Sequence, residues 1–349
     1  MLENTSFQCI IVTVIIGDNH YQLRWINMIH KLFRLDIMII LLVVLSIISM
    51  FVGVVDLSPG DLFNLTDNQK NIIMESRFPR TIAIIIAGAS LSVCGLIMQQ
   101  LTRNKFVSPT TAGTMDWARL GILIALMFFP TASLLVKLLF ASALSLAGTL
   151  LFMQIIQRVQ FKDVVFVPLI GLMLGNVVSS VATFLSLRTN SVQSLSSWLQ
   201  GDFSIIISGR YEVLYISIPF LIIALLYANQ FTIAGMGQDF SKNLGLNYRR
   251  VINIGLLITA VITALVVVTV GMLPFLGLII PNIISIFRGD HLKNTILQTA
   301  VLGAVFVMIC DILGRVIIFP YEISIGLMIG VIGSFIFLIM IFRRVKSNA

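Results

Sequence analysis

The sequence contains little charge and much apolar side chain. Only 11% of its 349 residues are Asp, Glu, Lys or Arg, and 58% are hydrophobic, whereas about a quarter of the residues of a soluble domain are charged. The mean hydropathy of +1.02 points the same way. A water-soluble core cannot bury this much apolar side chain, so lipid must be the main solvent of the chain.

Cysteine and histidine are also rare. Cys9, Cys94 and Cys310 lie in or beside apolar stretches, without the spacing of a metal-binding pair. They read as small buried hydrophobic residues rather than as metal ligands or disulfide partners. The three histidines all fall in loops or in the amino-terminal region. We therefore predict no metal site in the chain.

The sequence lacks the motifs of the common catalytic sites. It contains no HExxH, no GxSxG and no P-loop of the form GxxxxGK[ST]. We therefore expect no enzymatic activity and no cofactor bound by this chain. If transport is active, its energy must come from a partner that binds ATP or from an ion gradient.

The chain carries a formal net charge of +8. Such a surplus can indicate nucleic-acid binding, but here the basic residues are scattered between apolar runs and do not cluster with aromatic residues. A membrane protein with positively charged cytoplasmic loops explains them better.

Apolar runs predict an all-α polytopic membrane protein with about ten spans, most of them near the roughly twenty residues needed to cross a bilayer. The eighth run is short and needs a neighbour, a tilt or a broken helix to cross. The predicted spans cover residues 36–55, 81–101, 112–130, 132–156, 164–187, 212–230, 251–271, 275–287, 296–318 and 322–342.

The lysines and arginines predict which side of the membrane each loop occupies. With both termini inside, the inner segments carry 15 lysines and arginines and the outer segments carry 6. Since cytoplasmic loops are enriched in these residues, both termini are predicted to be cytoplasmic and the protein to reside in the plasma membrane.

The amino-terminal region is not predicted to span the membrane. Residues 1–35 form an extension whose apolar run is too short to span and lacks a basic segment before it. An alternative start at Met28 places a basic segment directly before the first span, and we favour it as a hypothesis. A single permease domain then covers residues 36–344, followed by a tail at 345–349.

Small residues recur within several spans. Gly88, Ser92 and Gly95 occur in the second span, and Gly171 and Gly175 in the fifth. Such spacing lets helix backbones approach closely, so we expect a tight bundle.

Two arginines mark the predicted outer start of the second span. Arg77 and Arg80 flank Pro79, which suits the first turn of a helix. Positive charge is unfavourable at this end of a helix dipole, and an acidic partner outside would relieve the cost. Contact with lipid headgroups explains the pair equally well.

Charged residues also occur within the spans. Asp311 and Arg315 are four apart in the ninth span, so they share a helix face and can pair. Asp116 and Arg119 are three apart near the start of the third span. Intramembrane charges suggest function, and a structural pair that neutralises itself is at least as good an explanation.

The longest predicted inner loop, at about residues 235–247, contains a short amphipathic stretch between glycines. It can form one or two helical turns outside the membrane, which suits a docking element for a cytoplasmic partner. Its candidate residues are Gly235, Gly237, Asp239, Asn243, Leu244 and Gly245.

Together these segments resemble the siderophore, haem and cobalamin permeases of ATP-binding-cassette importers, over residues 36–344. In chain order the matching pieces are Arg77-Phe78-Pro79-Arg80, Ala87-Gly88-Ala89, Gly95 with Gln99, Arg103-Asn104, Ser108-Pro109, Trp198-Leu199-Gln200-Gly201, Asn243-Leu244-Gly245, Gly277-Leu278-Ile279-Ile280-Pro281, Asp311 to Arg315, and Pro320-Tyr321-Glu322-Ile323-Ser324-Ile325-Gly326.

The resemblance implies a cobalamin-importer-like fold and several partners. These are a second permease subunit, two cytoplasmic ATPase subunits docked on the loop at 235–247, and an outer substrate-binding protein. Arg77, Arg80 and Arg315 match docking positions for that binding protein. The polar candidates for the pathway are Gln99, Asn104, Asp116, Arg119 and Asp311.

Two departures from the family pattern suggest a subgroup. Asn104-Lys105-Phe106-Val107 stands where Asn-Pro-Leu-Ala is usual, and Pro281-Asn282 stands where Pro-His is usual. The run from Asn104 to Arg119 resembles permeases for catecholate siderophores, including petrobactin. We therefore expect import of a ferric siderophore by alternating access. The alternatives are import of haem or cobalamin, and an ion-coupled secondary transporter that uses Asp311.

Overall fold

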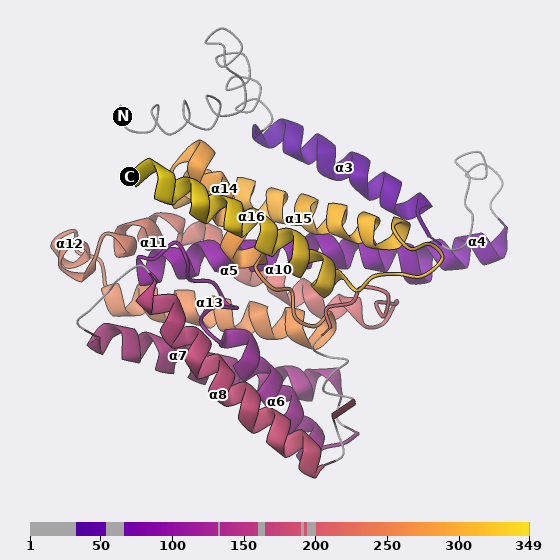
Figure 1. Ribbon diagram of the computed structural model, residues 1–349, viewed down its shortest axis with the longest axis horizontal. Coiled ribbons are helices and arrows are strands. Elements are labelled where there is room, and N and C mark those ends of the chain that lie inside the picture. Colours follow the sequence, from indigo (N-terminus) through magenta and orange to yellow (C-terminus); the bar gives the residue numbers. More distant parts are fainter. Residues whose placement is uncertain are drawn as a thin grey trace, which may run out of the picture.

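The computed structural model describes residues 33–53, 66–131, 133–159, 165–189, 192–193 and 200–348, and these residues form helices and loops without a β-strand (Figure 1). The predicted all-α fold is confirmed. The helical segments are α3 (Leu35–Phe51), α4 (Asp67–Ile72), η2 (Ile73–Arg77), α5 (Phe78–Thr102), α6 (Thr114–Phe128), α7 (Leu134–Arg158), α8 (Phe166–Arg188), η3 (Tyr211–Ile216), α10 (Ser217–Leu226), α11 (Ala228–Gly235), α12 (Gln238–Asn243), α13 (Tyr248–Thr269), α14 (Leu276–Arg288), α15 (Leu292–Val316) and α16 (Ile325–Asn348). The amino-terminal extension and the alternative start at Met28 lie outside the described residues.

Each predicted span coincides with helix, but the helices differ in length. In the described part, six helices are long and apolar enough to cross a membrane, or seven if the bent pair Tyr211–Leu226 and Ala228–Gly235 is one span. This sixth span bends by 60°. The eighth is short, as predicted, because α14 has only 13 residues. The exact number of crossings stays a prediction.

The helix of the second span is longer than predicted and begins well before residue 81, the predicted start. Thr66 caps α4, where its hydroxyl accepts the Gln69 N–H and the Gln69 side chain binds the Thr66 N–H. The helix then continues from Gln69 to Thr102 without a break. Arg77 and Arg80 therefore lie inside a long helix. The prediction that they occupy the positive end of a helix dipole was wrong.

A π-helical turn lets this long helix pass Pro79. Proline has no N–H and its ring crowds the carbonyl four residues earlier, so it normally breaks a helix. Here η2 widens the turn just before Pro79, and the Glu75 carbonyl accepts instead the Ser208 N–H at 3.0 Å. The wide turn joins the outer part of the helix to the loop at 200–210.

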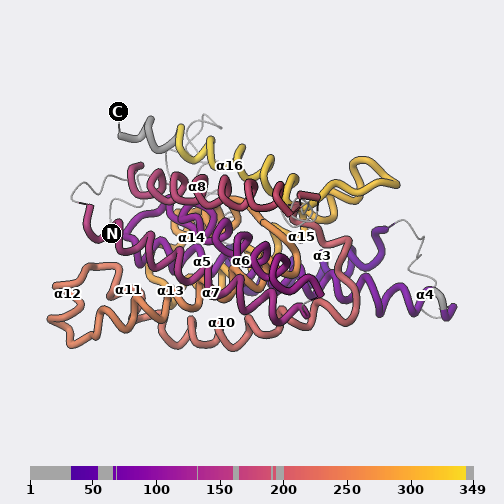
Figure 2. Tube along the Cα trace, turned by 90° about the horizontal axis from the view of Figure 1, so that it is seen from below, coloured from indigo at the N-terminus to yellow at the C-terminus, as the bar shows by residue number. Residues whose placement is uncertain are grey.

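Helices α5 and α13 occupy the centre of the bundle, and both are mostly buried. Helices α7, α8 and α16 are much less buried. Figure 2 shows α8 and α16 along one side of the bundle and α10 along the opposite side. Figure 1 shows α12 and α4 at opposite ends of the long axis, which we call the α12 end and the α4 end.

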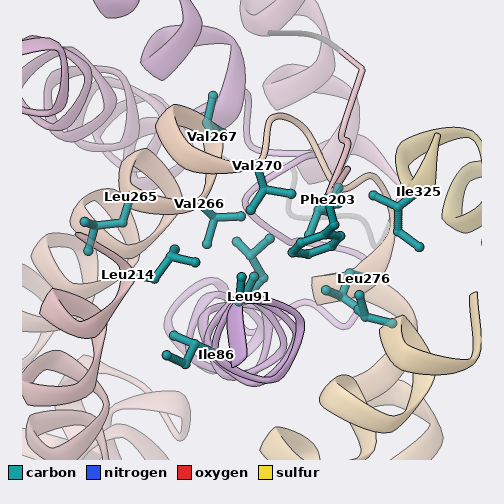
Figure 3. Close-up of a cluster of buried hydrophobic side chains, with 14 of the residues drawn as sticks. Ile86, Leu91, Phe203, Leu214, Leu265, Val266, Val267, Val270, Leu276 and Ile325 are labelled. Atoms are coloured by element: carbon teal, nitrogen blue, oxygen red, sulfur yellow. The ribbon is translucent and has the colours of Figure 1, made fainter. Parts of the chain in front are cut away.

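A non-helical stretch at 270–275 leads into α14 and is buried by apolar side chains. Phe203 lies between Val270 of this stretch and Leu276 of α14 (Figure 3). The Val270 carbonyl accepts the Asp202 N–H at 2.9 Å. Irregular backbone at membrane depth is tolerated only where protein satisfies its polar groups, and this stretch meets that condition.

The predicted close helix packing is confirmed at two glycines of α5. A Cβ atom on Gly95 would lie 1.8 Å from the carbonyl oxygen of Gly277 in α14. A Cβ on Gly88 would lie 2.8 Å from the carbonyl oxygen of Gly303 in α15. Both obstacles are backbone, which cannot move aside as a flexible side chain could.

We expect Gly95→Ala to destabilise the fold strongly. Overpacking against backbone should force α5 and α14 apart and lower the free energy of unfolding by about 3 kcal/mol. Gly330→Ala is the control, because a Cβ there meets its nearest atom, Pro274 Cγ, at an ordinary 3.7 Å. Thermal unfolding in detergent measures both. Equal melting temperatures for the two variants would contradict the packing described.

Candidate functional site

An ion-pair network joins three segments at the α4 end. Arg80 of α5 contacts Asp311 of α15 at 2.8 Å and Glu322, before α16, at 2.8 Å. Asp311 also pairs with Arg315, one turn further along α15. The predicted pairing of Asp311 with Arg315 is confirmed, and the network balances two guanidinium groups with two carboxylates.

Arg315 and Arg77 bind the carboxyl end of α3. Arg315 donates to the carbonyl oxygens of Ser49 and Val52 at 2.9 and 2.8 Å, and Arg77 donates to the carbonyl of Met50. The last carbonyls of a helix have no partner within it and carry partial negative charge, so guanidinium groups suit them. Two arginines from α15 and η2 thus attach α3 to the bundle.

The burial of these arginines changes the interpretation of the predicted docking positions. Arg77 is 7% exposed and Arg315 is 5% exposed. Only the Arg80–Glu322 pair reaches the surface, with side chains 13% and 29% exposed. Glu322 was not among the residues predicted to have a role. Its signal was an acid beside an apolar run in a chain with little charge.

The polar candidates Gln99 and Asn104 lie near α14. The Gln99 amide donates to the carbonyl of Leu278 at 3.3 Å. The Asn104 side chain accepts the Phe106 N–H at 2.8 Å and so closes a turn at the end of α5. Both residues are buried; Gln99 supports the backbone of α14 and Asn104 the turn that follows α5.

Asp116 and Arg119 do not form the pair that their spacing suggested. In the described part of the chain no ion pair joins them, and Arg119 instead donates to the hydroxyl of Ser179 in α8 at 2.9 Å. Asp116 faces Gly175 of α8, where a Cβ would meet its carboxylate at 2.7 Å. The two charges therefore contact the same helix, α8, one turn apart.

The outward face of α8 carries a row of polar residues. Asn176, Ser180 and Thr183 are all exposed and follow one another by four and three residues. The Ser180 and Thr183 hydroxyls donate to carbonyls of their own helix, which leaves their oxygens as acceptors. Asn176 lies at the middle of this 23-residue helix. An exposed amide at that depth is unfavourable against lipid, so this face requires water or protein beside it.

The segment at 235–247, which we call the α12 element, contains the short helix that the sequence predicted, α12. Gly237 precedes α12 with a φ of 116° and Gly245 follows it with a φ of 75°, conformations that favour glycine. Gly235 packs against the side chain of Gln100. Asp239 and Asn243 are exposed on the helix between these glycines.

An exposed apolar row crosses the α12 element. Met236, Phe240 and Leu244 follow one another at intervals of four residues and are 54%, 48% and 58% exposed. A cavity of about 460 Å³ borders α12 and is lined by Gln238, Lys242, Gly245, Leu246, Asn247, Tyr248 and Arg249. A helix that presents large apolar side chains beside a groove is typical of a protein docking site.

The described residues give no sign of a metal site, and they include only part of the motif Trp198-Leu199-Gln200-Gly201. The part of the chain that the structure covers holds no group of three His, Cys, Asp or Glu side chains placed to bind a metal ion. Trp198 and Leu199 of the quoted motif lie outside the described residues.

Most of the chain matches one known family of transport proteins. A model of the FecCD transport family matches residues 41–343. The chain belongs to the FecCD transport family. This confirms the resemblance read from the motifs and agrees with a multi-pass membrane protein that acts as a transport subunit.

Several known permease proteins and a solved transporter structure are similar to most of this chain. The petrobactin import system permease protein YclN of Bacillus subtilis (strain 168) is 63% identical over 311 residues, which cover 89% of this chain and 98% of that protein. The ferric-anguibactin transport system permease protein FatD of Vibrio anguillarum is 40% identical, over 79% of this chain and 88% of that protein. A solved inward-facing metal-chelate type ABC transporter has a TM-score of 0.76 at 22% identity, over 88% of this chain and 98% of that one. It supports the fold.

We expect Asp311→Asn to destabilise the protein. The change leaves Arg80 and Arg315 without a buried carboxylate between them, which should lower the free energy of unfolding by roughly 3–5 kcal/mol. Asp36→Asn is the control, because its pair with Arg34 has side chains 70% and 60% exposed. Such an exposed pair contributes about 1 kcal/mol or less. A chemical denaturation series in detergent that finds equal losses would contradict the network's role.

Proposed function

We propose that this chain is a permease subunit of an ATP-binding-cassette importer that moves a ferric siderophore of the catecholate class into the cytoplasm. The observation that carries the proposal is the 63% identity to the petrobactin permease of Bacillus subtilis over 98% of that protein. The run Asn104–Arg119, which resembles catecholate siderophore permeases, supports the substrate class. The transporter resides in the plasma membrane with both termini in the cytoplasm.

Two cytoplasmic ATPase subunits supply the energy, and each permease subunit offers the α12 element as its contact. The exposed row of Met236, Phe240 and Leu244 supports this assignment. Such side chains lie outside the apolar part of the helices and gain free energy when a partner covers them. ATP is bound by the partner, and this chain holds no cofactor.

A second permease subunit, identical or closely related, covers the face of α8 and α16. The polar row of Asn176, Ser180 and Thr183 supports a watery path at this interface, because lipid is a poor neighbour for it. Asp116 and Arg119 lie directly behind the row, against Gly175 and Ser179 of α8. The path opens to one side of the membrane at a time by movement of the helices.

An outer siderophore-binding protein docks at the α4 end. Arg80 is the reachable cation of the predicted docking set, since Arg77 and Arg315 hold α3. An acidic surface on the binding protein would contact Arg80 beside Glu322. Arg77 and Arg315 then support the docking surface from below.

An ion-coupled secondary transporter is a poorer account of this geometry. Its strongest candidate, Asp311, is bound by two guanidinium groups and is 2% exposed. Both of its oxygens are engaged, which leaves no free carboxylate for a proton or sodium ion. Import of haem or cobalamin would use the same fold and differs only in the cargo.

Reconstituted transport tests the proposal. Proteoliposomes that contain this chain, its ATPase and a binding protein loaded with ferric petrobactin should accumulate iron only with ATP on the ATPase side. Omitting ATP or the binding protein should abolish uptake. Uptake driven by an ion gradient without ATP would contradict the importer. Uptake of haem or cobalamin in place of ferric petrobactin would contradict the substrate class.

We expect Leu244→Ser to weaken the binding of the ATPase subunits by at least about tenfold, because it removes an apolar side chain from the docking row. Asn243→Ser, on the polar side of the same helix, should bind as the wild type does. Titration of labelled ATPase onto the purified permease in nanodiscs measures both. Unchanged affinity in Leu244→Ser would remove this row from the interface.

A further inference from the structure

The two departures from the family pattern, Lys105 and Asn282, contact each other. The amide of Asn282 in α14 donates to the carbonyl of Lys105 at 2.8 Å. The Lys105 ammonium group lies 2.9 Å from the Asp290 carboxylate, in the turn that follows α14, and donates to the Ser285 hydroxyl in the last turn of α14 at 2.8 Å. Ser285 in turn donates to Asp290. We call Lys105, Asn282, Ser285 and Asp290 the latch.

The latch connects two turns at the α12 end. One is the loop from Arg103 to Gly113 between α5 and α6, and the other is the turn at 289–291 between α14 and α15. The first loop is held in shape by its own hydrogen bonds, including Phe106 N–H to Asn104 and Ser108 N–H to the Thr111 hydroxyl. It can therefore move as a unit when its anchor moves.

The second turn is also attached to the α12 element. The Gln100 amide donates to the Asp290 carbonyl at 3.2 Å, and the Gln100 side chain packs on Gly235 at the end of α11. The Leu292 N–H donates to the Thr232 hydroxyl of α11 at 3.2 Å. The Ser241 hydroxyl of α12 donates to the Ile233 carbonyl of α11 at 3.0 Å. A displacement of α12 therefore reaches α11 and, through these two contacts, the turn at 289–291.

The first loop reaches the exposed side of the bundle. The ring of Phe106 packs edge-on against Phe337 of α16 with centroids 5.8 Å apart, and Phe337 lies 6.4 Å from Phe275. Phe106 thus stands beside a helix whose outer face is free in this chain. The contacts run without a gap from α12, through the turn at 289–291 and the latch, to α16.

We propose that the latch is the device that carries movement of the α12 element to the loop at 103–113, with Lys105 as its positioning residue. The proposal rests on the proposed function, in which ATPase subunits move the α12 element. Pro at position 105, as in the usual family pattern, would remove the ammonium group, so the device belongs to chains with Lys at this position.

The ion pair between Lys105 and Asp290 is suited to a switch because it is of moderate strength. The side chains of Lys105 and Asp290 are 43% and 58% exposed. A pair exposed to this degree contributes little by itself, and its strength comes from the shared contacts with Ser285 and Asn282. It can hold the loop in one state and release it in another.

Hydrogen exchange in the full-length protein tests the latch without transport. In nanodiscs, Lys105→Met should speed exchange of the Phe106, Val107 and Ser108 amides by about fivefold. Lys293→Met is the control, because this exposed lysine lies in the first turn of α15 and takes no part in the latch. Exchange of the double variant Lys105→Asp with Asp290→Lys should return to within about twofold of the wild type.

Coupling in the reconstituted importer gives the second readout. Lys105→Met should hydrolyse more ATP per siderophore imported, and the charge-swapped pair should recover the wild-type ratio. Unchanged exchange in Lys105→Met, or a swapped pair no better than the single variants, would overturn the latch. Faster exchange with unchanged coupling would overturn its role in transmission. If the wild type imports nothing with ATP, the proposed function fails. Hydrogen exchange still shows whether Lys105 holds the loop at 103–113 in place.

Discussion

The ion-pair network of Arg80, Asp311, Arg315 and Glu322 is the interaction on which the α4 end depends. Asp311 and Arg315 lie where water is scarce, and a buried charge is tolerated only when it is paired and hydrogen-bonded. The network places α5 against α15, and Arg315 extends it to the end of α3. Without Asp311 the two guanidinium groups would repel each other, and three helices would lose their common attachment.

The same constraint accounts for the other polar groups within the bundle. Gln99 and Asn282 bind backbone carbonyls, and Arg119 binds Ser179. Asn176 differs, because its amide lies exposed at the middle of a membrane-spanning helix. Lipid cannot satisfy it, and so the face of α8 that carries it belongs to an interface or a path. The transport function of the FecCD family gives such a path a use.

Much of the fold followed from the sequence because lipid allows few solutions. The all-α fold, the short eighth span, a short helix within the loop at 235–247 and the Asp311–Arg315 pair were all predicted and are confirmed. Local irregularities of the helices and contacts between distant segments could not be predicted from the sequence. Pro79 suggested a helix start, since a widened turn that rescues a proline leaves no local signal. The pairs Arg80–Glu322 and Lys105–Asp290 join segments that are far apart in the sequence. Periodicity within one helix cannot reveal such partners.

The central claim is that the polar face of α8 faces water in the assembled transporter rather than lipid. Asn176→Cys, in a chain whose Cys9, Cys94 and Cys310 are replaced, can be treated with a membrane-impermeant maleimide. Leu139→Cys on α7, where the native side chain is 68% exposed and apolar, is the control for a lipid-facing position. The account predicts labelling at position 176 in the ATP-free or the ATP-bound state, and none at position 139. Equal protection of both positions in both states would contradict it.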